Sequence, residues 1–430
     1  MNFFCDIIRD VVIFMKITRQ KGTKDIYFDE IKVWQYAEAN IKRICESYNV
    51  NEIRTPVFEA TELYSRGVGD ETDIVNKEMY TFLDKGGRSI TLRPELTAGV
   101  VRSYIENGMS SLHSPLKFWY TSNMYRYEKM QKGRYREFVQ FGVEIFGSDS
   151  YLADLETIGI SNDFFESINL RDKLILSINS IGCKECRKAY LEKLKEFVKP
   201  NLDKMCDTCK TRFEKNPMRM LDCKEDKCKE ILKDAPIITD CLCDDCREDF
   251  EKVKKGLEAL NIDYTVDTSI VRGLDYYNKT VYEWTSKDLG LAVGGGGRYD
   301  GLVEILDGPH TPAVGFGIGM DRVIMLLREY DLVKDIFDRV DFYIAALDEN
   351  SNFKVASIVK QLRNKGYIVD NNITSRNFKN QLKYADKIKA RYAIIVGEDE
   401  VKNNICQLKN MENGNQVQCA LDTDDIIKNM

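Results

Sequence analysis

A cation, two phenols and a run of glycines occur close together between residues 272 and 301. Arg272 opens the sequence Arg-Gly-Leu-Asp-Tyr-Tyr, which ends in Tyr276 and Tyr277, and residues 292–301 read Ala-Val-Gly-Gly-Gly-Gly-Arg-Tyr-Asp-Gly. Arginine presents a planar, permanently charged fork to a phosphate or carboxylate. Glycines let backbone approach a ligand closely, and tyrosine hydroxyls can hydrogen-bond a polar ring. The combination predicts a site for a small amino acid beside a phosphate.

Two further arginines lie in segments that suit a nucleotide. Arg126 lies near the end of the β-prone run 118–127, which a charged loop separates from a second β-prone run, 137–146. An arginine on a rigid strand can clamp a phosphate and favour in-line attack on phosphorus. Arg322 follows the glycine-rich residues 315–319. Such glycines leave room for a nucleotide, but alone they fit a tight strand-to-helix packing contact equally well.

An antiparallel sheet would position these residues. The two β-prone runs that flank the loop after Arg126 are close enough for an antiparallel hairpin, unlike the alternating pattern of a Rossmann fold. Residues 29–48 carry apolar side chains at helical spacing, with Asp29 as the expected cap. The proline-bearing run 53–58 indicates a strand at a sheet edge, and 313–327 reads as a glycine-rich strand that runs into a helix.

The overall composition is that of a globular protein of two or three domains. The 430 residues are 43% hydrophobic and 31% charged, and no apolar window of about twenty residues could span a bilayer. The apolar start, 1–14, is interrupted by charges and lacks a signal-peptide cleavage site. We therefore expect a cytoplasmic protein in which Met15 is an alternative start.

The net charge of −6 argues against indiscriminate nucleic-acid binding. An RNA partner would need local basic patches. One candidate spans 184–233, with fifteen Lys or Arg against ten Asp or Glu. This run and the second candidate, which is given next, could each instead be the solvated face of a helix. The other candidate, opposed only by Asp386, comprises Arg376, Lys379, Lys383, Lys387, Lys389 and Arg391.

Thirteen cysteines in a long chain without a signal peptide favour a reducing compartment. Nine of them fall between residues 183 and 246, where three Cys-x-x-Cys pairs occur. This spacing permits structural zinc coordinated by thiolates. Small, buried, reduced thiols are the alternative. The nine are Cys183, Cys186, Cys206, Cys209, Cys223, Cys228, Cys241, Cys243 and Cys246.

In these segments the chain resembles the histidyl-tRNA synthetase family, a class II aminoacyl-tRNA synthetase family. The three class II motifs have candidates in the correct order: the helix and strand that end near Phe58, the residues 118–144, and the residues 315–322. The resemblance implies an α+β fold. Its parts would be a catalytic domain with an antiparallel sheet flanked by helices, a helical insertion and a C-terminal α/β anticodon-binding domain.

The resemblance also implies a division of the chain. We expect a poorly ordered extension at 1–15, a catalytic core at 16–180 and 262–328, a Cys- and Lys-rich insertion at 181–261, a linker at 329–339 and an anticodon-binding domain at 340–430.

The family's site residues carry over onto matching positions of this chain. The resemblance places the ATP phosphates against Arg126, Arg272 and Arg322, which would be the catalytic residues, with Glu128 also at ATP. Arg272 would touch histidine as well. For histidine it implies Glu95 and Thr97 at the α-amino group, Gln140 at the backbone of the amino acid, Glu144 and Tyr277 at the two imidazole nitrogens, and Tyr276 in the pocket wall.

The activity implied is that of a homodimeric histidine–tRNA ligase, with histidine, ATP, Mg²⁺ and the histidine tRNA as substrates or partners. One alternative is the related regulatory subunit of ATP phosphoribosyltransferase, which shares the fold but lacks the anticodon domain and usually loses the catalytic residues. Arg126, Arg272 and Arg322 are present here. A second alternative, a stress-kinase regulatory module, would require an attached kinase domain.

Overall fold

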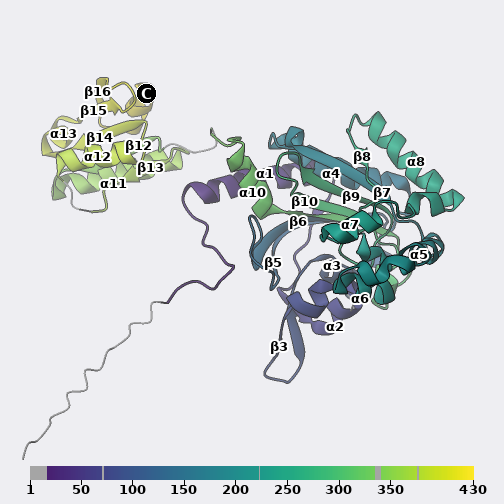
Figure 1. Ribbon diagram of the computed structural model, residues 1–430. Coiled ribbons are helices and arrows are strands. Elements are labelled where there is room, and N and C mark those ends of the chain that lie inside the picture. Colours follow the sequence, from purple (N-terminus) through teal and green to yellow (C-terminus); the bar gives the residue numbers. More distant parts are fainter. Residues whose placement is uncertain (1–16, 70–71, 222, 335–339, 375–376) are drawn as a thin grey trace, which may run out of the picture. The chain divides into compact units, whose positions relative to one another are not determined.

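The computed structural model describes residues 17–69, 72–221, 223–334, 340–374 and 377–430 (Figure 1). The chain divides into two compact units, Met1–Lys334 and Asp335–Met430, and each is described by itself. The predicted extension at 1–15 lies outside the described residues, as do residues 335–339 of the predicted linker. No helix in the described part is both long and apolar enough to cross a membrane.

An eight-stranded sheet forms the centre of the first unit. Neighbouring strands are antiparallel, except for the short edge strands β1 and β8, which pair in parallel with β5 and β7. The strands follow one another across the sheet as β1 (Asn51–Glu52), β5 (Leu116–Tyr125), β6 (Glu137–Phe146), β11 (Ala313–Gly319), β10 (Ala292–Arg298), β9 (Asn278–Ser286), β7 (Leu174–Ser180) and β8 (Thr265–Val266).

Helices cover this sheet, and a three-stranded sheet adjoins it (Figure 1). The helices α1, α4, α8 and α10 form one group, in which α4 and α10 contact β6, whereas α2, α3 and α9 pack on one another. The helices are α1 (Asp29–Ser47), α2 (Thr61–Val68), α3 (Thr97–Glu106), α4 (Tyr151–Ser167), α8 (Asp244–Ala259), α9 (Leu302–Ile305) and α10 (Met320–Glu329). The small sheet has the order β2 (Phe58–Ala60), β4 (Ser89–Leu92) and β3 (Tyr80–Leu83).

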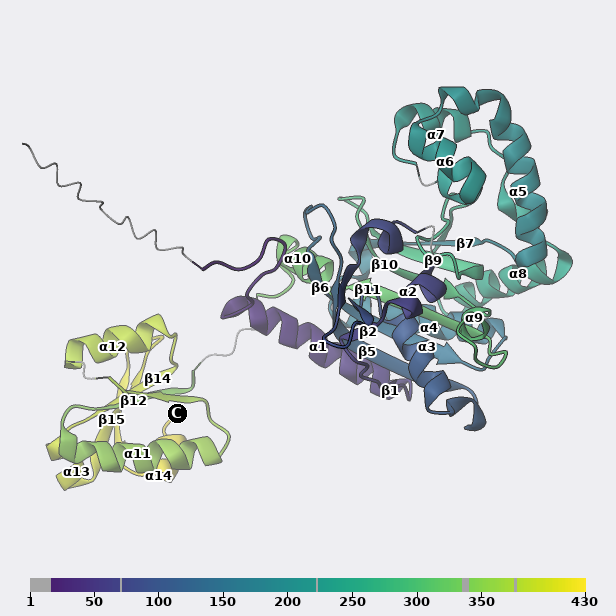
Figure 2. The same ribbon diagram turned by 90° about the horizontal axis from the view of Figure 1, so that it is seen from below.

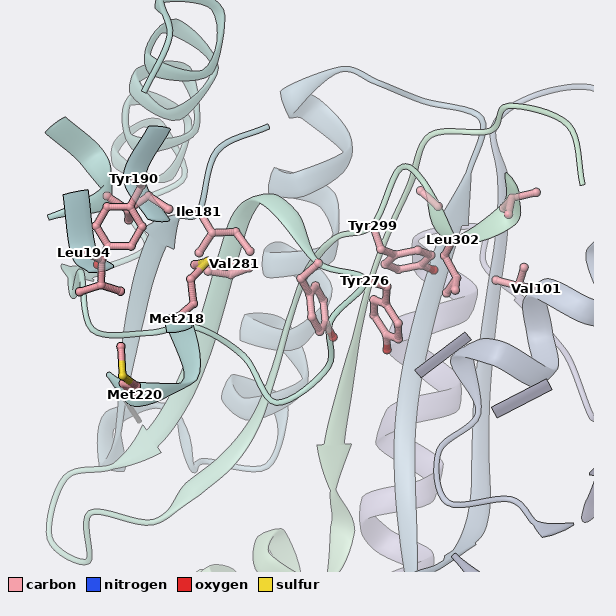
Figure 3. Close-up of a cluster of buried hydrophobic side chains, with 14 of the residues drawn as sticks. Val101, Ile181, Tyr190, Leu194, Met218, Met220, Tyr276, Val281, Tyr299 and Leu302 are labelled. Atoms are coloured by element: carbon pink, nitrogen blue, oxygen red, sulfur yellow. The ribbon is translucent and has the colours of Figure 1, made fainter. Parts of the chain in front are cut away.

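Between β7 and β8 the chain leaves the sheet and forms mostly short helices (Figure 2). This segment comprises α5 (Lys184–Val198), α6 (Asp207–Lys215), the 3-10 helix η5 (Pro217–Met220), α7 (Asp226–Leu232) and α8. Its apolar side chains are continuous with the core of the sheet. Figure 3 shows the buried cluster that runs from Tyr190, Leu194, Met218 and Met220 to Tyr276, Tyr299 and Leu302.

The second unit is a five-stranded sheet with helices. Its strands β13, β12 and β14 pair in parallel, whereas β15 and β16 pair antiparallel. The strand order is β13 (Val369–Asn371), β12 (Phe342–Ala346), β14 (Tyr392–Val396), β15 (Ile405–Asn410) and β16 (Gln416–Ala420), and the helices are α11 (Glu349–Asn364), α12 (Phe378–Lys387), α13 (Glu398–Asn403) and α14 (Thr423–Lys428).

The predicted fold class is confirmed. The hairpin β5–β6 forms with Phe118 opposite Glu144, and the glycine-rich strand β11 runs into α10 as predicted for 313–327. The parallel strands and helices expected beyond residue 340 also form, although β15 and β16 were not predicted.

Two local predictions are wrong. Asp29 is the first residue of α1 and not its cap, because Phe28 precedes the helix without a capping hydrogen bond. The run 53–58 is not one strand, since only Phe58 belongs to a strand, β2. Proline has no N–H to give to a sheet. The carbonyls of Thr55 and Pro56 accept hydrogen bonds from the Arg93 side chain instead, at 2.9 and 3.2 Å.

Candidate active site

The carboxylate of Glu144 lies at the centre of a group of buried hydroxyls. Its Oε1 accepts hydrogen bonds from Thr97 Oγ1 at 2.7 Å and from the Tyr120 hydroxyl at 3.1 Å. Its Oε2 accepts a short hydrogen bond from the Tyr299 hydroxyl. Only 1% of Glu144 is exposed. The neighbouring strand leaves room for this carboxylate because Gly315 faces it, where a Cβ would lie 1.9 Å from Oε2.

Burial raises the pKa of the Glu144 carboxyl to about 8, although the hydroxyls that donate to it oppose the shift. A buried carboxyl of this kind holds its proton near neutral pH. A ligand that brings an N–H donor or a positive charge would favour the carboxylate. The site can therefore select a polar, protonatable ring.

A second carboxylate, Glu95, has one unsatisfied oxygen. Its Oε1 accepts a hydrogen bond from the backbone N–H of Ala98 at 3.0 Å. Its Oε2 is buried and has no hydrogen-bond partner in the structure. Burial raises the pKa of this carboxyl too. Because an unpaired buried oxygen is costly, a cationic ligand at this point would be stabilised.

Three tyrosine rings stand beside these carboxylates. The ring centroids of Tyr276 and Tyr277 are 4.7 Å apart, and that of Tyr299 lies 5.5 and 6.5 Å from them. All three residues are buried. We call Glu95, Thr97, Glu144, Tyr276 and Tyr277, together with Tyr120 and Tyr299, the tyrosine–carboxylate cluster.

Arg272 adjoins this cluster from a strained backbone. Its φ of 21° lies in the left-handed region, which is costly for a residue with a side chain. The guanidinium lies 5.9 Å from the Tyr277 ring and 2.7 Å from Glu283 Oε2, and Nε is buried without a partner. A Cβ on Gly295 would lie 2.6 Å from Arg272 Nη1. The glycine run of β10 thus makes room for this arginine.

The other predicted residues line a cavity of ≈ 140 Å³, which we call the arginine cavity. Arg126 is fixed by a 2.7 Å hydrogen bond from Nε to the carbonyl of Pro94 and faces Glu128 at 3.6 Å. Arg322 donates a short hydrogen bond to the Ala292 carbonyl, and burial lowers the pKa of its guanidinium. The predicted residues in its wall are Arg126, Glu128, Gln140 and Arg322, and sequence reasoning missed Arg134.

The structure thus gathers the predicted residues into two groups rather than one. Arg272, Glu95 and the tyrosines do not line the arginine cavity. Strand β6 joins the groups, because Gln140 lies in the cavity wall and Glu144 lies in the cluster. Residues four apart on a strand share a face and are roughly 13 Å apart. A ligand that spans both groups would be a small polar molecule joined to an anion.

In the tyrosine–carboxylate cluster, sequence reasoning missed Tyr299 and Tyr120. Tyr299 directly follows Arg298, which is 2% exposed and pairs with Asp154 at 2.5 Å. Arg298 also donates to the carbonyls of Ser148 and Ser150, each at 2.8 Å. This anchor fixes the end of β10. The sequence signal that could have indicated Tyr299 is its position directly after Arg298 at the end of the glycine run.

Known protein families and relatives are similar to this chain over nearly its full length. A family model described as "Histidyl-tRNA synthetase" matches residues 22–323, and one described as "Anticodon binding domain" matches residues 341–429. A relative named "Histidine--tRNA ligase" from Acetivibrio thermocellus is 51% identical over 94% of this chain and 97% of its own length. One of the same name from Clostridium perfringens is 47% identical over 96% and 99%.

Solved structures are similar as well. The apo histidyl-tRNA synthetase of S. aureus matches with a TM-score of 0.81 and 36% identity, covering 96% of this chain and 99% of its own. The histidyl-tRNA synthetase of Nostoc sp. PCC 7120 matches with a TM-score of 0.69 at 21% identity, over 96% and 100%, and shows likeness of fold alone.

Replacing Glu144 by glutamine should flatten the pH dependence of stability. The pKa of this carboxyl is about 8 when folded, against 4.5 for the ordinary group. The contribution of this carboxyl to the stability of the folded chain is therefore fully present below pH 4.5 and is lost as the pH rises through the folded pKa. When the pH is raised from about 5 to about 8, the free energy of unfolding of the wild-type chain should fall by roughly 3 kcal/mol more than that of Glu144→Gln.

The measurement is urea unfolding followed by tryptophan fluorescence, which reports on the first unit because Trp34, Trp119 and Trp284 all lie there. Glu192→Gln, at an exposed position of α5, is the control and should follow the wild type. Parallel profiles for the wild type and Glu144→Gln would refute the assignment of a raised pKa to this carboxyl.

Proposed function

The chain belongs to the histidyl-tRNA synthetase family, and on that premise we propose that its active site binds histidine in the tyrosine–carboxylate cluster and ATP in the arginine cavity. The activity is the ligation of histidine to tRNA. The main support for placing histidine in the cluster is its pair of buried carboxylates. Glu95 has an oxygen without a partner, and Glu144 is surrounded by hydroxyls.

Histidine suits both carboxylates. Its α-ammonium would satisfy Glu95 Oε2, the buried oxygen without a partner. Its imidazole would donate an N–H to Glu144, while the Tyr277 hydroxyl, in the adjoining ring group, would serve the other ring nitrogen. An aromatic substrate without ring nitrogens would leave Glu144 unpaired in a buried place, and polar sites of this kind reject such ligands strongly.

ATP suits the arginine cavity. Arg126 and Arg322 would contact its phosphates, Gln140 would hold the backbone of histidine at the boundary, and Glu128 would orient Arg126. In the first step the histidine carboxylate attacks the α-phosphorus and pyrophosphate leaves, which produces histidyl-adenylate. We propose that Mg²⁺ accompanies ATP and neutralises charge on its β- and γ-phosphates.

Arg272 would stabilise the charge that develops on the α-phosphate. Its guanidinium stands beside Tyr277 and is held by Glu283, so it approaches the reacting atoms from the histidine side, with Arg126 on the nucleotide side. Preorganised cations of this kind are worth several kcal/mol in the transition state. In the second step a ribose hydroxyl of the tRNA attacks the acyl carbon, and AMP leaves.

The tRNA would reach the second unit through α12. Lys379, Lys383 and Lys387 lie on this helix and are exposed, as are Lys389 and Arg391 after it, whereas Arg376 lies outside the described residues. The loop 128–136 beside the arginine cavity would meet the acceptor end. We propose a homodimer in the cytoplasm, where the many free cysteines of the described chain stay reduced.

Histidine-dependent exchange of pyrophosphate into ATP tests the proposal without tRNA. We expect exchange with histidine and none above background with phenylalanine, because phenylalanine cannot pair with Glu144. The assay measures label transferred from pyrophosphate to ATP for each amino acid. Equal exchange with the two amino acids, or none with histidine, would contradict the proposed division of the site.

Replacing Arg272 by alanine should lower kcat for adenylate formation by roughly 10² or more, with a smaller effect on KM for histidine. Lysine should restore activity only in part, because it lacks the planar fork. Arg88→Ala, an arginine whose side chain is 82% exposed, is the control. A variant that keeps its kcat and loses only affinity for histidine would remove Arg272 from the catalytic step.

Neutralising Lys379, Lys383 and Lys387 together should reduce the salt dependence of tRNA binding. Each lost phosphate contact lowers the log–log slope by roughly 0.7 to 0.9. The matched control replaces three exposed lysines of the same unit, Lys360, Lys402 and Lys428, for an equal change of charge. Binding is measured over a salt series, and pyrophosphate exchange should be unaffected. Equal slopes for the two triple variants would mean that α12 faces solvent.

A further inference from the structure

Eight of the nine cysteines in the segment 183–246 converge in two groups of four. Within each group all four Sγ atoms lie within 4.8 Å of one another. The first group links the start of α5 to the start of α8, and the second links the start of α6 to α7 and the turn before α7. The first group is Cys183, Cys186, Cys243 and Cys246, and the second is Cys206, Cys209, Cys223 and Cys228.

The sulfur spacing fits a metal and does not fit disulfides. Cys183 and Cys186 have their sulfurs 3.5 Å apart, and the sulfurs of Cys206 and Cys223 are 3.8 Å apart. A disulfide requires about 2.0 Å. Four sulfurs bonded to one tetrahedral zinc at about 2.3 Å are separated by ~3.8 Å. Thiols that merely fill space have no reason to converge in fours.

We propose that each group binds one Zn²⁺ through four thiolates. A tetrahedral set of four soft sulfur ligands favours zinc among the common biological cations. A cluster of several irons would place its thiolates on different irons and therefore spread them further. With all four positions taken by protein, neither site would be catalytic, and both would be structural.

The backbone around both groups is arranged for thiolates. The N–H of Cys243 donates to Cys186 Sγ at 3.1 Å, and the N–H of Cys206 donates to Cys228 Sγ at 3.3 Å. Such hydrogen bonds orient the ligands and stabilise their charge. Gly182 has a φ of 64°, and a Cβ there would lie 2.5 Å from the Cys186 Cβ. The chain therefore needs glycine at this point for the first group to close.

The second group brackets side chains that hold the loop of the tyrosine–carboxylate cluster. Asn216 and Arg219 lie between Cys209 and Cys223, and both donate to Asp275 Oδ1, at 2.9 and 3.0 Å. Arg219 also donates to the carbonyl of Gly273 at 2.9 Å.

The first group is attached to the same loop from its other end. Arg187 directly follows Cys186 and donates to the carbonyl of Tyr277 at 3.0 Å. Met218 and Val281, which lies just beyond the loop, also belong to one buried hydrophobic cluster (Figure 3). Both zinc sites thereby fix residues that position Arg272 to Tyr277. This part of the inference rests on the proposed histidine site, whereas the metal assignment does not.

Metal analysis of the untagged full-length chain, purified without chelator, tests the assignment directly. We expect about two zinc per chain by mass spectrometry. Chains prepared with Co²⁺ should show the visible bands of tetrahedral cobalt–thiolate coordination. A chain that folds and carries no stoichiometric metal, or that carries iron, would overturn the proposal.

Paired substitutions separate the two sites. Cys183→Ser with Cys246→Ser, and Cys206→Ser with Cys223→Ser, should each leave about one zinc per chain. Cys241→Ser is the matched control, because Cys241 lies in the same segment but in neither group, and it should retain two. Two zinc in a paired variant would refute that site. If a variant is insoluble, the metal content and cobalt spectrum of the unaltered chain decide.

The positioning role has its own readout. Arg219→Ala and the Cys206/Cys223 variant should each raise KM for histidine about tenfold or more, with a much smaller change in KM for ATP. Lys224→Ala, exposed next to Cys223, should change neither. Unchanged KM values with two zinc in the native chain would overturn the positioning role alone. Absence of histidine exchange in the wild type would instead count against the proposed function.

Discussion

The need to satisfy a buried carboxylate governs the centre of this structure. Glu144 of β6 is buried among three hydroxyls, those of Thr97 in α3, Tyr120 in β5 and Tyr299 just after β10. The neighbouring positions must then be free of side chains, because a Cβ on Gly142 would lie 2.3 Å from the Tyr120 ring and one on Gly315 would meet Glu144 itself. Glycine weakens a strand by roughly 0.5–1 kcal/mol. These glycines lower the stability of the sheet, but they leave the space in which the Glu144 carboxylate and the Tyr120 ring are enclosed.

Strand β6 contributes one residue to each of the two groups, and both residues face the same side because they are four apart on one strand. Gln140 borders the arginine cavity and Glu144 belongs to the tyrosine–carboxylate cluster. The cluster, where we propose that histidine binds, is buried and rich in hydroxyls, so that unpaired groups in it are costly. The arginine cavity is instead lined by three arginines, Arg126, Arg134 and Arg322. Arg272 adjoins the tyrosine–carboxylate cluster, where its guanidinium lies 5.9 Å from the Tyr277 ring.

Local pattern predicted most of the elements, and the residues that escaped it depend on distant partners. The hairpin around Arg126 and the strand before Arg322 follow from alternation and glycine content. Phe28 and not Asp29 precedes α1. The carbonyls of Thr55 and Pro56 accept hydrogen bonds from Arg93, a residue distant in the sequence that the local pattern does not indicate. Tyr299 was missed because its place is set by the burial of Arg298 against Asp154. Cysteine spacing indicated pairs, but which pairs converge is decided by the fold.

The position of the helical segment between β7 and β9 has a consequence for the order of folding. These strands are hydrogen-bonded neighbours, yet Ser180 and Asn278 are separated in sequence by the whole segment. Closing a loop of roughly a hundred residues is slower than closing a short one. When Cys183 and Cys246 come together, the open part of that loop shrinks to roughly a third, which lowers the entropic cost by about 1 kcal/mol. Once the first cysteine group has formed, the pairing of β7 with β9 therefore has a shorter loop left to close.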